Sequence, residues 1–172
     1  TARQLNALQT DVAGAVYEFV CSEDGCRYET KLQISDPGDP TRVVCRVSAN
    51  GDRVAVSACW TGGSFEQPVA ATVYLFKRKG LGWVEEGKIT SSGVHEPSTF
   101  GHAISLGSNW LAIGSRLESH SDYYQVGAVY LYKYDGTKWV LVQRATSPSQ
   151  YDDRNFGAAI DLRRDYLVVA AV

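Results

Sequence analysis

The stretch "GAVYLYKYDGTKW", residues 127–139, carries the clearest structural signal in the chain. Residues 127–132 are rich in β-branched and aromatic side chains, which predicts a strand. Asp135-Gly136 predicts a tight turn because glycine readily adopts a positive φ, and Trp139 should begin a second strand. The stretch therefore predicts a β-hairpin.

The same hairpin pattern recurs along the chain. "GAVYEF" begins at Gly14 and "ATVYLF" at Ala71, so the steps to "GAVYLY" at Gly127 are 57 and 56 residues. Other landmarks keep this step: Trp83 and Trp139, Phe100-Gly101 and Phe156-Gly157, and Val44-Cys45 one period upstream of Phe100-Gly101. A fixed period of this length indicates stacked structural repeats.

Each period should contain four short strands. In the best copy they are expected at 102–107, 110–115, 127–134 and 139–146. Their apolar residues occupy both faces, so the sheets should be covered on both sides. These features predict an all-β protein built of β-propeller blades of four antiparallel strands, with about 56 residues per repeat.

The expected strand count is twelve, which equals three blade equivalents. Closed propellers typically have ~4 to 8 blades, so we expect the chain to be part of a larger propeller. The alternative is that another chain covers the exposed blade faces.

The repeated residues resemble the FG-GAP repeat, the blade type of the integrin α-subunit propeller. The resemblance covers residues 14–172, with copies starting near 14, 71 and 127, and leaves residues 1–13 as an N-terminal extension. It implies that Gly101 and Gly157 permit close backbone approach between blades. Phe100 and Phe156 should fill the gap between blades, so their expected role is core packing.

Calcium is where the sequence departs from this resemblance. Several members of the family carry an Asp-rich loop between the Phe-Gly pair and the next strand. The equivalent connections here are "SANGDR", "SLGSNW" and "DLRRDY", and none offers the oxygen ligands that calcium needs. We therefore expect no calcium in these blades and no cofactor elsewhere.

The composition excludes several classes of function. The net charge is -2 and the only basic run, residues 77–79, falls at an expected hairpin tip, so nothing points to nucleic acid. No apolar run approaches the ~20 residues of a spanning helix, which argues against membrane insertion. Nucleophile-elbow, P-loop and two-histidine metal motifs are all missing from the sequence, so we do not expect an enzyme.

The four cysteines indicate the compartment. Cys21 and Cys26 bracket the first hairpin turn, and Cys45 and Cys59 fall on neighbouring expected strands. The strand positions favour the pairings 21–26 and 45–59 among three connectivities, while free thiols remain an alternative. The spacing does not suit a four-cysteine zinc site. Disulfides persist in oxidising compartments, so we expect an extracellular or cell-surface protein.

Long connections should gather at one end of the blades, because the second-to-third and fourth-to-first connections of an antiparallel meander emerge together. Loops on a rigid scaffold often carry recognition. The candidate residues in them are Trp60, Phe65, His95, Glu96, Glu118, His120, Asp122, Tyr123, Tyr124, Tyr151, Asp152 and Asp153. The histidines with Glu96, Glu118 and Asp122 could instead form a metal or acid–base site, and the aromatic residues could be pinned to the blade edge.

Three functional hypotheses follow from the sequence. The first is a non-catalytic surface propeller that binds protein or glycan through its long loops. The second is a structural subunit of an extracellular filament that assembles with further copies of itself through exposed blade edges. The third is a propeller hydrolase or lyase whose active site lies outside these residues.

Overall fold

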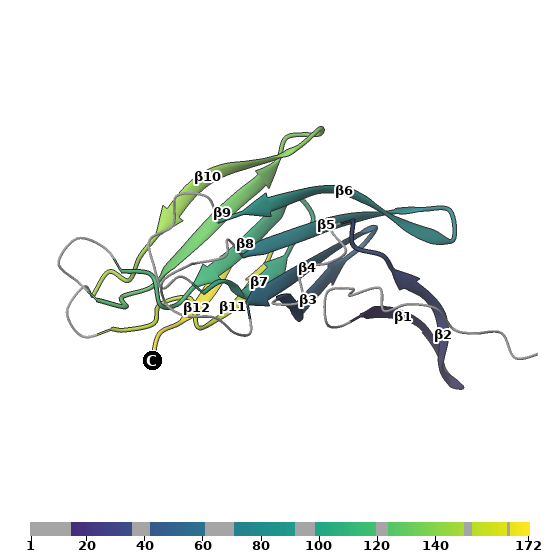
Figure 1. Cartoon of the computed structure of the whole chain (residues 1–172), viewed down its shortest axis with the longest axis horizontal. Helices are drawn as coiled ribbons and strands as arrows, with labels where there is room; N and C mark the ends of the chain where they lie inside the picture. Colours follow the sequence, from purple (N-terminus) through teal and green to yellow (C-terminus); the bar gives the residue numbers. More distant parts are fainter. Residues whose placement is uncertain are drawn as a thin grey trace, which may run out of the picture.

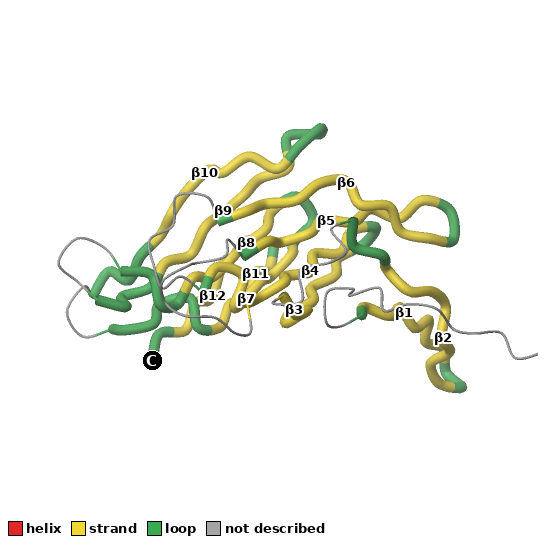
Figure 2. Tube along the Cα trace, in the orientation of Figure 1, coloured by secondary structure: helices red, strands yellow, loops and turns green. Residues whose placement is uncertain are grey.

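The computed structural model describes residues 15–35, 42–60, 71–91, 99–119, 124–149, 153–164 and 166–172, without the side chains of residues 42, 43, 59 and 60. These residues form strands and turns, with no helix among them (Figures 1 and 2). In chain order the strands are β1 (Val16–Ser22), β2 (Gly25–Leu32), β3 (Arg42–Asn50), β4 (Arg53–Trp60), β5 (Thr72–Lys79), β6 (Gly82–Thr90), β7 (Phe100–Leu106), β8 (Trp110–Ser115), β9 (Ala128–Tyr134), β10 (Trp139–Ala145), β11 (Ala159–Arg163) and β12 (Tyr166–Ala170).

The strands form the blade-like sheets that the sequence predicts. β3–β6 and β7–β10 are two four-stranded antiparallel meanders, in which each strand pairs with its neighbours in the chain. The hairpin β1–β2 and the hairpin β11–β12 form two-stranded sheets on either side of them in sequence. The all-β class and the four-stranded antiparallel sheets are thus confirmed, and they are consistent with propeller blades.

The sheet β3–β6 is apolar on both faces because it packs on both sides. Ala55, Val73 and Leu75 join a buried cluster with residues of β7–β9. The alternate positions, including Val56 and Tyr74, join a second cluster with residues of β1 and β2. This alternation is the two-residue period of a strand, here buried at both phases.

β7, the first strand of its sheet, contacts the first strands of the sheets that precede and follow it. β7 lies against β3 and β4 on one side and β11 on the other. The backbone N–H of Leu106 donates to Ser48 Oγ at 3.0 Å, and one period later the N–H of Leu162 donates to Ser105 Oγ at 2.9 Å. The same serine contact therefore joins successive sheets along their first strands, β3, β7 and β11, which we call the inner strands.

Phe100 and Gly101 lie at this junction. Phe100 is buried and makes an edge-to-face contact with Tyr130, with ring centroids 5.4 Å apart. A Cβ on Gly101 would lie 3.1 Å from the Cβ of Ser57 in the preceding sheet. One period later Phe156 is half-buried and forms a β-bridge with Gly127. The repeated Phe-Gly pair thus lies where successive sheets meet.

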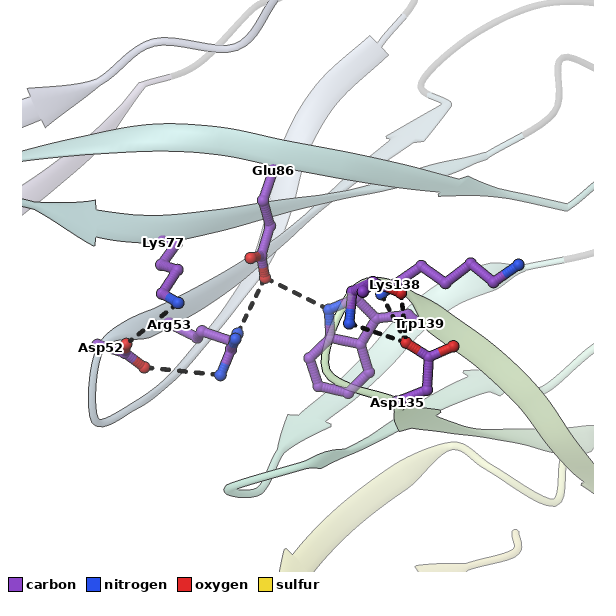
Figure 3. Close-up of polar contacts among 8 residues, drawn as sticks. Asp52, Arg53, Lys77, Glu86, Asp135, Lys138 and Trp139 are labelled. Atoms are coloured by element: carbon purple, nitrogen blue, oxygen red, sulfur yellow. Dashed lines mark hydrogen bonds and ion pairs between the residues drawn. The ribbon is translucent and has the colours of Figure 1, made fainter.

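Polar contacts also join successive sheets at the fourth strands, β6 and β10, which we call the outer strands. Figure 3 shows the contacts between the sheets β3–β6 and β7–β10. Arg53 Nε donates to Glu86 Oε1 at 3.0 Å, and the indole N–H of Trp139 reaches the same oxygen at 3.4 Å. The Arg53 guanidinium also lies 4.1 Å from the ring centroid of Tyr134. One period earlier, the indole N–H of Trp83 donates to Glu18 at 2.9 Å. Each tryptophan thus ties its outer strand to a carboxylate of the preceding sheet.

The turn between β9 and β10 is held by the Asp135 carboxylate. Asp135 Oδ1 accepts hydrogen bonds from the backbone N–H groups of Thr137 and Lys138 at 2.8 and 2.9 Å, and from the Thr137 hydroxyl at 2.8 Å. These bonds stabilise the ionised carboxylate, so they lower the pKa of Asp135 to about 2, with the Lys138 N–H as the largest cause.

The lowered pKa predicts an acid-sensitive turn. The stabilisation is present above the ordinary pKa of 3.8 and is lost as the pH falls toward about 2. We expect the stability difference between the native protein and Asp135→Asn to shrink over this range. Carboxyl-carbon NMR should place the Asp135 midpoint near 2, and a midpoint at 3.8 would contradict the assignment.

Candidate functional site

Described residues of the four long connections lie at one end of the sheets, and Figure 2 draws several of them as green loops near the C-terminus. The connections span residues 61–71, 91–99, 116–127 and 146–158, of which the structure describes residues 71, 91, 99, 116–119, 124–127, 146–149 and 153–158. Hydrogen bonds link each to the next: Ser91 N–H to Ala71 O, Leu117 N–H to Thr99 Oγ1, and Asn155 N–H to Gln125 O. We call this end the long-connection face. It is the region that the sequence proposes for recognition.

Most of the candidate recognition residues lie outside the described part of the chain. These residues are Phe65, His95, Glu96, His120, Asp122, Tyr123, Tyr151 and Asp152, together with the side chain of Trp60. Within the described residues, no group of three or more His, Cys, Asp or Glu side chains is arranged to hold a metal ion. The proposed metal or acid–base site involving the two loop histidines stays untested.

Glu118 is a buried anchor, which corrects its assignment to the exposed loop residues. Only 4% of Glu118 is exposed. Its Oε2 accepts a hydrogen bond from the Tyr130 hydroxyl at 2.8 Å, and its Oε1 accepts from Arg144 Nε at 2.8 Å and pairs with Arg144 Nη2 at 2.6 Å. The carboxylate is therefore engaged by β9 and β10 and does not face a partner molecule.

The backbone of Glu118 closes the 116–127 connection. Its carbonyl oxygen accepts from Gly127 N–H at 2.9 Å, and its N–H donates to Ser115 O at 3.2 Å. Glu118 thus fastens both ends of this connection to the sheet through its main chain while its side chain reaches β9 and β10. The sequence placed Glu118 in a loop but gave no sign of Tyr130 or Arg144, because these partners lie 12 and 26 residues away.

The electrostatics of this anchor follow from burial and charge. Burial raises the pKa of Tyr130, and the hydrogen bond to Glu118 adds to the effect, so the pKa is about 12. Burial opposes the charge on Arg144, but hydrogen bonding and attraction to Glu118 outweigh it and raise the pKa of Arg144. Tyr130 is therefore neutral and Arg144 charged at physiological pH.

The raised pKa of Tyr130 predicts a loss of stability in alkali. The unfolded chain ionises this tyrosine near pH 10, whereas the folded chain does so near 12. Stability from this site is complete below pH 10 and falls as the pH rises toward 12. Between pH 10 and 12, urea unfolding should show a smaller loss of unfolding free energy for Tyr130→Phe than for the native protein. Tyr166→Phe, at an exposed position, is the control, and the same change in both variants would contradict the prediction.

Tyr124 and Asp153 are the other candidate residues that the structure describes. Tyr124 is 62% exposed, so its ring is available for contact. Asp153 is half-buried, and its Oδ2 accepts from the Ser147 hydroxyl at 2.6 Å while its N–H donates to Ser149 O. Asp153 therefore shapes the 146–158 connection, whereas Tyr124 presents an aromatic surface to solvent.

The predicted Cys21–Cys26 disulfide is confirmed. The two residues face each other across β1 and β2, and their sulfur atoms are bonded. Cys45 is also disulfide-bonded, and the Ser57 hydroxyl lies 3.0 Å from its sulfur atom. The predicted pairing with Cys59 involves a side chain outside the described residues.

The comparison with known families agrees with this geometry. Residues 83–132 match the FG-GAP repeat. The matched segment begins in β6 and ends in β9, so it runs from the outer strand of one sheet to the third strand of the next and includes the Phe100-Gly101 junction. No curated protein matches the chain. No helix among the described residues is long and apolar enough to span a membrane. The chain is thus an all-β protein that carries an FG-GAP repeat in stacked, four-stranded sheets of the propeller-blade type.

Proposed function

We propose that this chain is a non-catalytic binding module of an extracellular or cell-surface β-propeller, which recognises protein or glycan through the long-connection face. The FG-GAP repeat supports a propeller-like binding domain, and the Cys21–Cys26 disulfide is typical of proteins in oxidising compartments.

The observation that carries the proposal is the contrast between the two ends of the sheets. At one end, hydrogen bonds join the described residues of four long connections, whereas the other end carries short turns. Glu118 ties the two described ends of the 116–127 connection to β9 and β10, so these ends are held in place before any ligand binds. A pre-organised loop loses less conformational entropy on binding, so affinity increases.

The test compares variants at the two ends. The native chain, labelled with a fluorophore, is applied to a printed glycan array and to immobilised extracellular matrix proteins. We expect Tyr124→Ala to weaken binding about tenfold, because an exposed interface aromatic commonly contributes more than 1 kcal/mol.

Leu81→Ala is the matched control at the short-turn end, because Leu81 is 82% exposed at the tip of the β5–β6 hairpin. It should leave binding unchanged. The proposal would be overturned if the native chain bound neither the glycans nor the matrix proteins, or if Tyr124→Ala and Leu81→Ala lost affinity equally.

A second candidate function is that of a structural subunit in an extracellular filament. It is favoured by aromatic side chains exposed on the two-stranded sheets, including Tyr17, Phe19 and Tyr28 on β1–β2 and Tyr166 on β12. Further copies could bury these side chains. Light scattering over a range of concentrations tests this: a growing mass that Phe19→Ser lowers supports it, and a constant monomer mass argues against it.

A further inference from the structure

A second candidate binding site lies at the short-turn end, away from the long-connection face. A cavity of about 380 Å³ opens there, within the size range of small-molecule sites. Three successive turns line it, namely those that join β3 to β4, β7 to β8, and β11 to β12. None of the residues considered for recognition in the sequence contributes to this cavity.

The serine contacts between inner strands bring the three turns together. Ser48 accepts from Leu106 N–H, and Ser105 accepts from Leu162 N–H, so each sheet is fixed to the next beside the cavity. Both serines line the cavity. Because a hydroxyl can donate as well as accept, each retains its own hydrogen for a ligand.

The charged residues of the cavity belong to the β11–β12 hairpin. Arg163 Nε donates to Asp161 Oδ2 at 3.0 Å and to Oδ1 at 3.2 Å, which balances one positive charge. Arg164 follows directly and also lines the cavity. The described lining residues therefore carry one positive charge in excess, together with donor groups from serine and asparagine side chains.

This inventory favours an oxyanion over a cation. Arginine donates through several N–H groups in a plane and suits carboxylate and sulfate groups. Metal cations need several oxygen ligands, and the two arginines would repel them. Among the described residues that line the cavity there is no aromatic side chain on which a nucleic-acid base could stack.

We propose that this cavity binds the acidic group of a sugar, such as the carboxylate of a uronic acid. Arg164 pairs with the carboxylate, and Arg163 assists while it remains bonded to Asp161. The side chains of Asn50 and Ser108, which also line the cavity, supply donors and acceptors for the sugar hydroxyls. The site is independent of the long-connection face.

The experiment measures binding of glucuronate to the full chain by saturation-transfer NMR and calorimetry. We expect a dissociation constant of about 1 mM, as for a single charged contact supported by hydroxyl groups. Arg164→Gln should weaken binding at least about tenfold, because it removes the charge and the forked guanidinium donors but keeps a polar side chain. Added salt should weaken binding to the native chain, since the pair is exposed to solvent.

Controls separate a built site from general attraction. Glucose tests the need for the carboxylate, acetate tests the need for the sugar, and Lys79→Gln removes an exposed positive charge on a different hairpin. The proposal is supported if the native chain binds glucuronate saturably and binds glucose and acetate more weakly. Glucuronate binding should also be weaker in Arg164→Gln and unchanged in Lys79→Gln. Equal affinity for glucose or acetate, an equal loss in Lys79→Gln, or no saturation by glucuronate overturns it.

Discussion

Gly157→Ala is expected to reduce the free energy of unfolding by about 3 kcal/mol, from backbone strain and steric overlap together. Gly157 has a φ of +90°, which disfavours any residue with a side chain. A Cβ there would lie 2.7 Å from the carbonyl oxygen of Ala128 and 3.1 Å from Val129 Cγ2. The oxygen belongs to a buried strand of the preceding sheet, so the two sheets would have to separate to make room.

Gly136→Ala is the matched control for this prediction. Gly136 has a φ of +105°, and a Cβ there would meet no atom within 4 Å, so it reports the backbone strain alone. We expect it to cost about 1 kcal/mol. Urea unfolding measures both variants, and hydrogen exchange at the Leu162 amide reports whether β11 detaches from the serine contact. Equal losses in the two variants would show that Gly157 does not hold a close contact between sheets.

Glu118→Ala is expected to cost about 2 to 4 kcal/mol, because removing one partner of a buried ion pair leaves the other uncompensated. The variant leaves the Arg144 guanidinium without its carboxylate and the Tyr130 hydroxyl without its acceptor. The Arg144 side chain is 29% exposed, so water relieves part of the cost and we expect a value in the lower half of this range. Urea unfolding gives the value.

Glu29→Ala is the control for the buried pair. Glu29 pairs with Arg27, and their side chains are 19% and 73% exposed; because the arginine is open to solvent, we expect this pair to contribute about 1 kcal/mol or less. Glu118→Gln should fall between the two, since its amide oxygen still accepts from Tyr130. If Glu118→Ala cost no more than Glu29→Ala, the anchor would be a surface contact and would not hold the 116–127 connection in place.

The two functional proposals can fail separately because they concern opposite ends of the molecule. Loss of ligand binding in Tyr124→Ala concerns the long-connection face, whereas loss of glucuronate binding in Arg164→Gln concerns the cavity at the short turns. A chain that kept one binding activity and lacked the other would support one proposal and overturn the other.

Much of the fold could be predicted from the sequence because the information is local and repeated. Strand residues 110–115 coincide with β8, and residues 139–146 differ from β10 by one residue. Cys21 and Cys26 face each other because the hairpin between them is short. Strand alternation and turn glycines act over a few residues, and the fixed period recurs along the sequence. All three can therefore be seen without knowing what packs against the strands.

The candidate site was less predictable because it depends on contacts between distant residues. Glu118 has the composition of an exposed loop residue, and only the positions of Tyr130 and Arg144 make it a buried anchor. The cavity likewise depends on turns that are more than 50 residues apart in the chain, since Ser48 and Leu106 meet only when the sheets stack.

The all-β class, the four-stranded unit, its period and the first disulfide could all be read from the amino-acid sequence, since each follows from local propensity or repetition. Which charged residues are buried, which turns share a cavity and how the sheets are joined became visible only once the strands were packed together. The physical reason is that burial and ion pairing depend on the packing partner, and a strand pattern specifies that a face is covered without specifying by what.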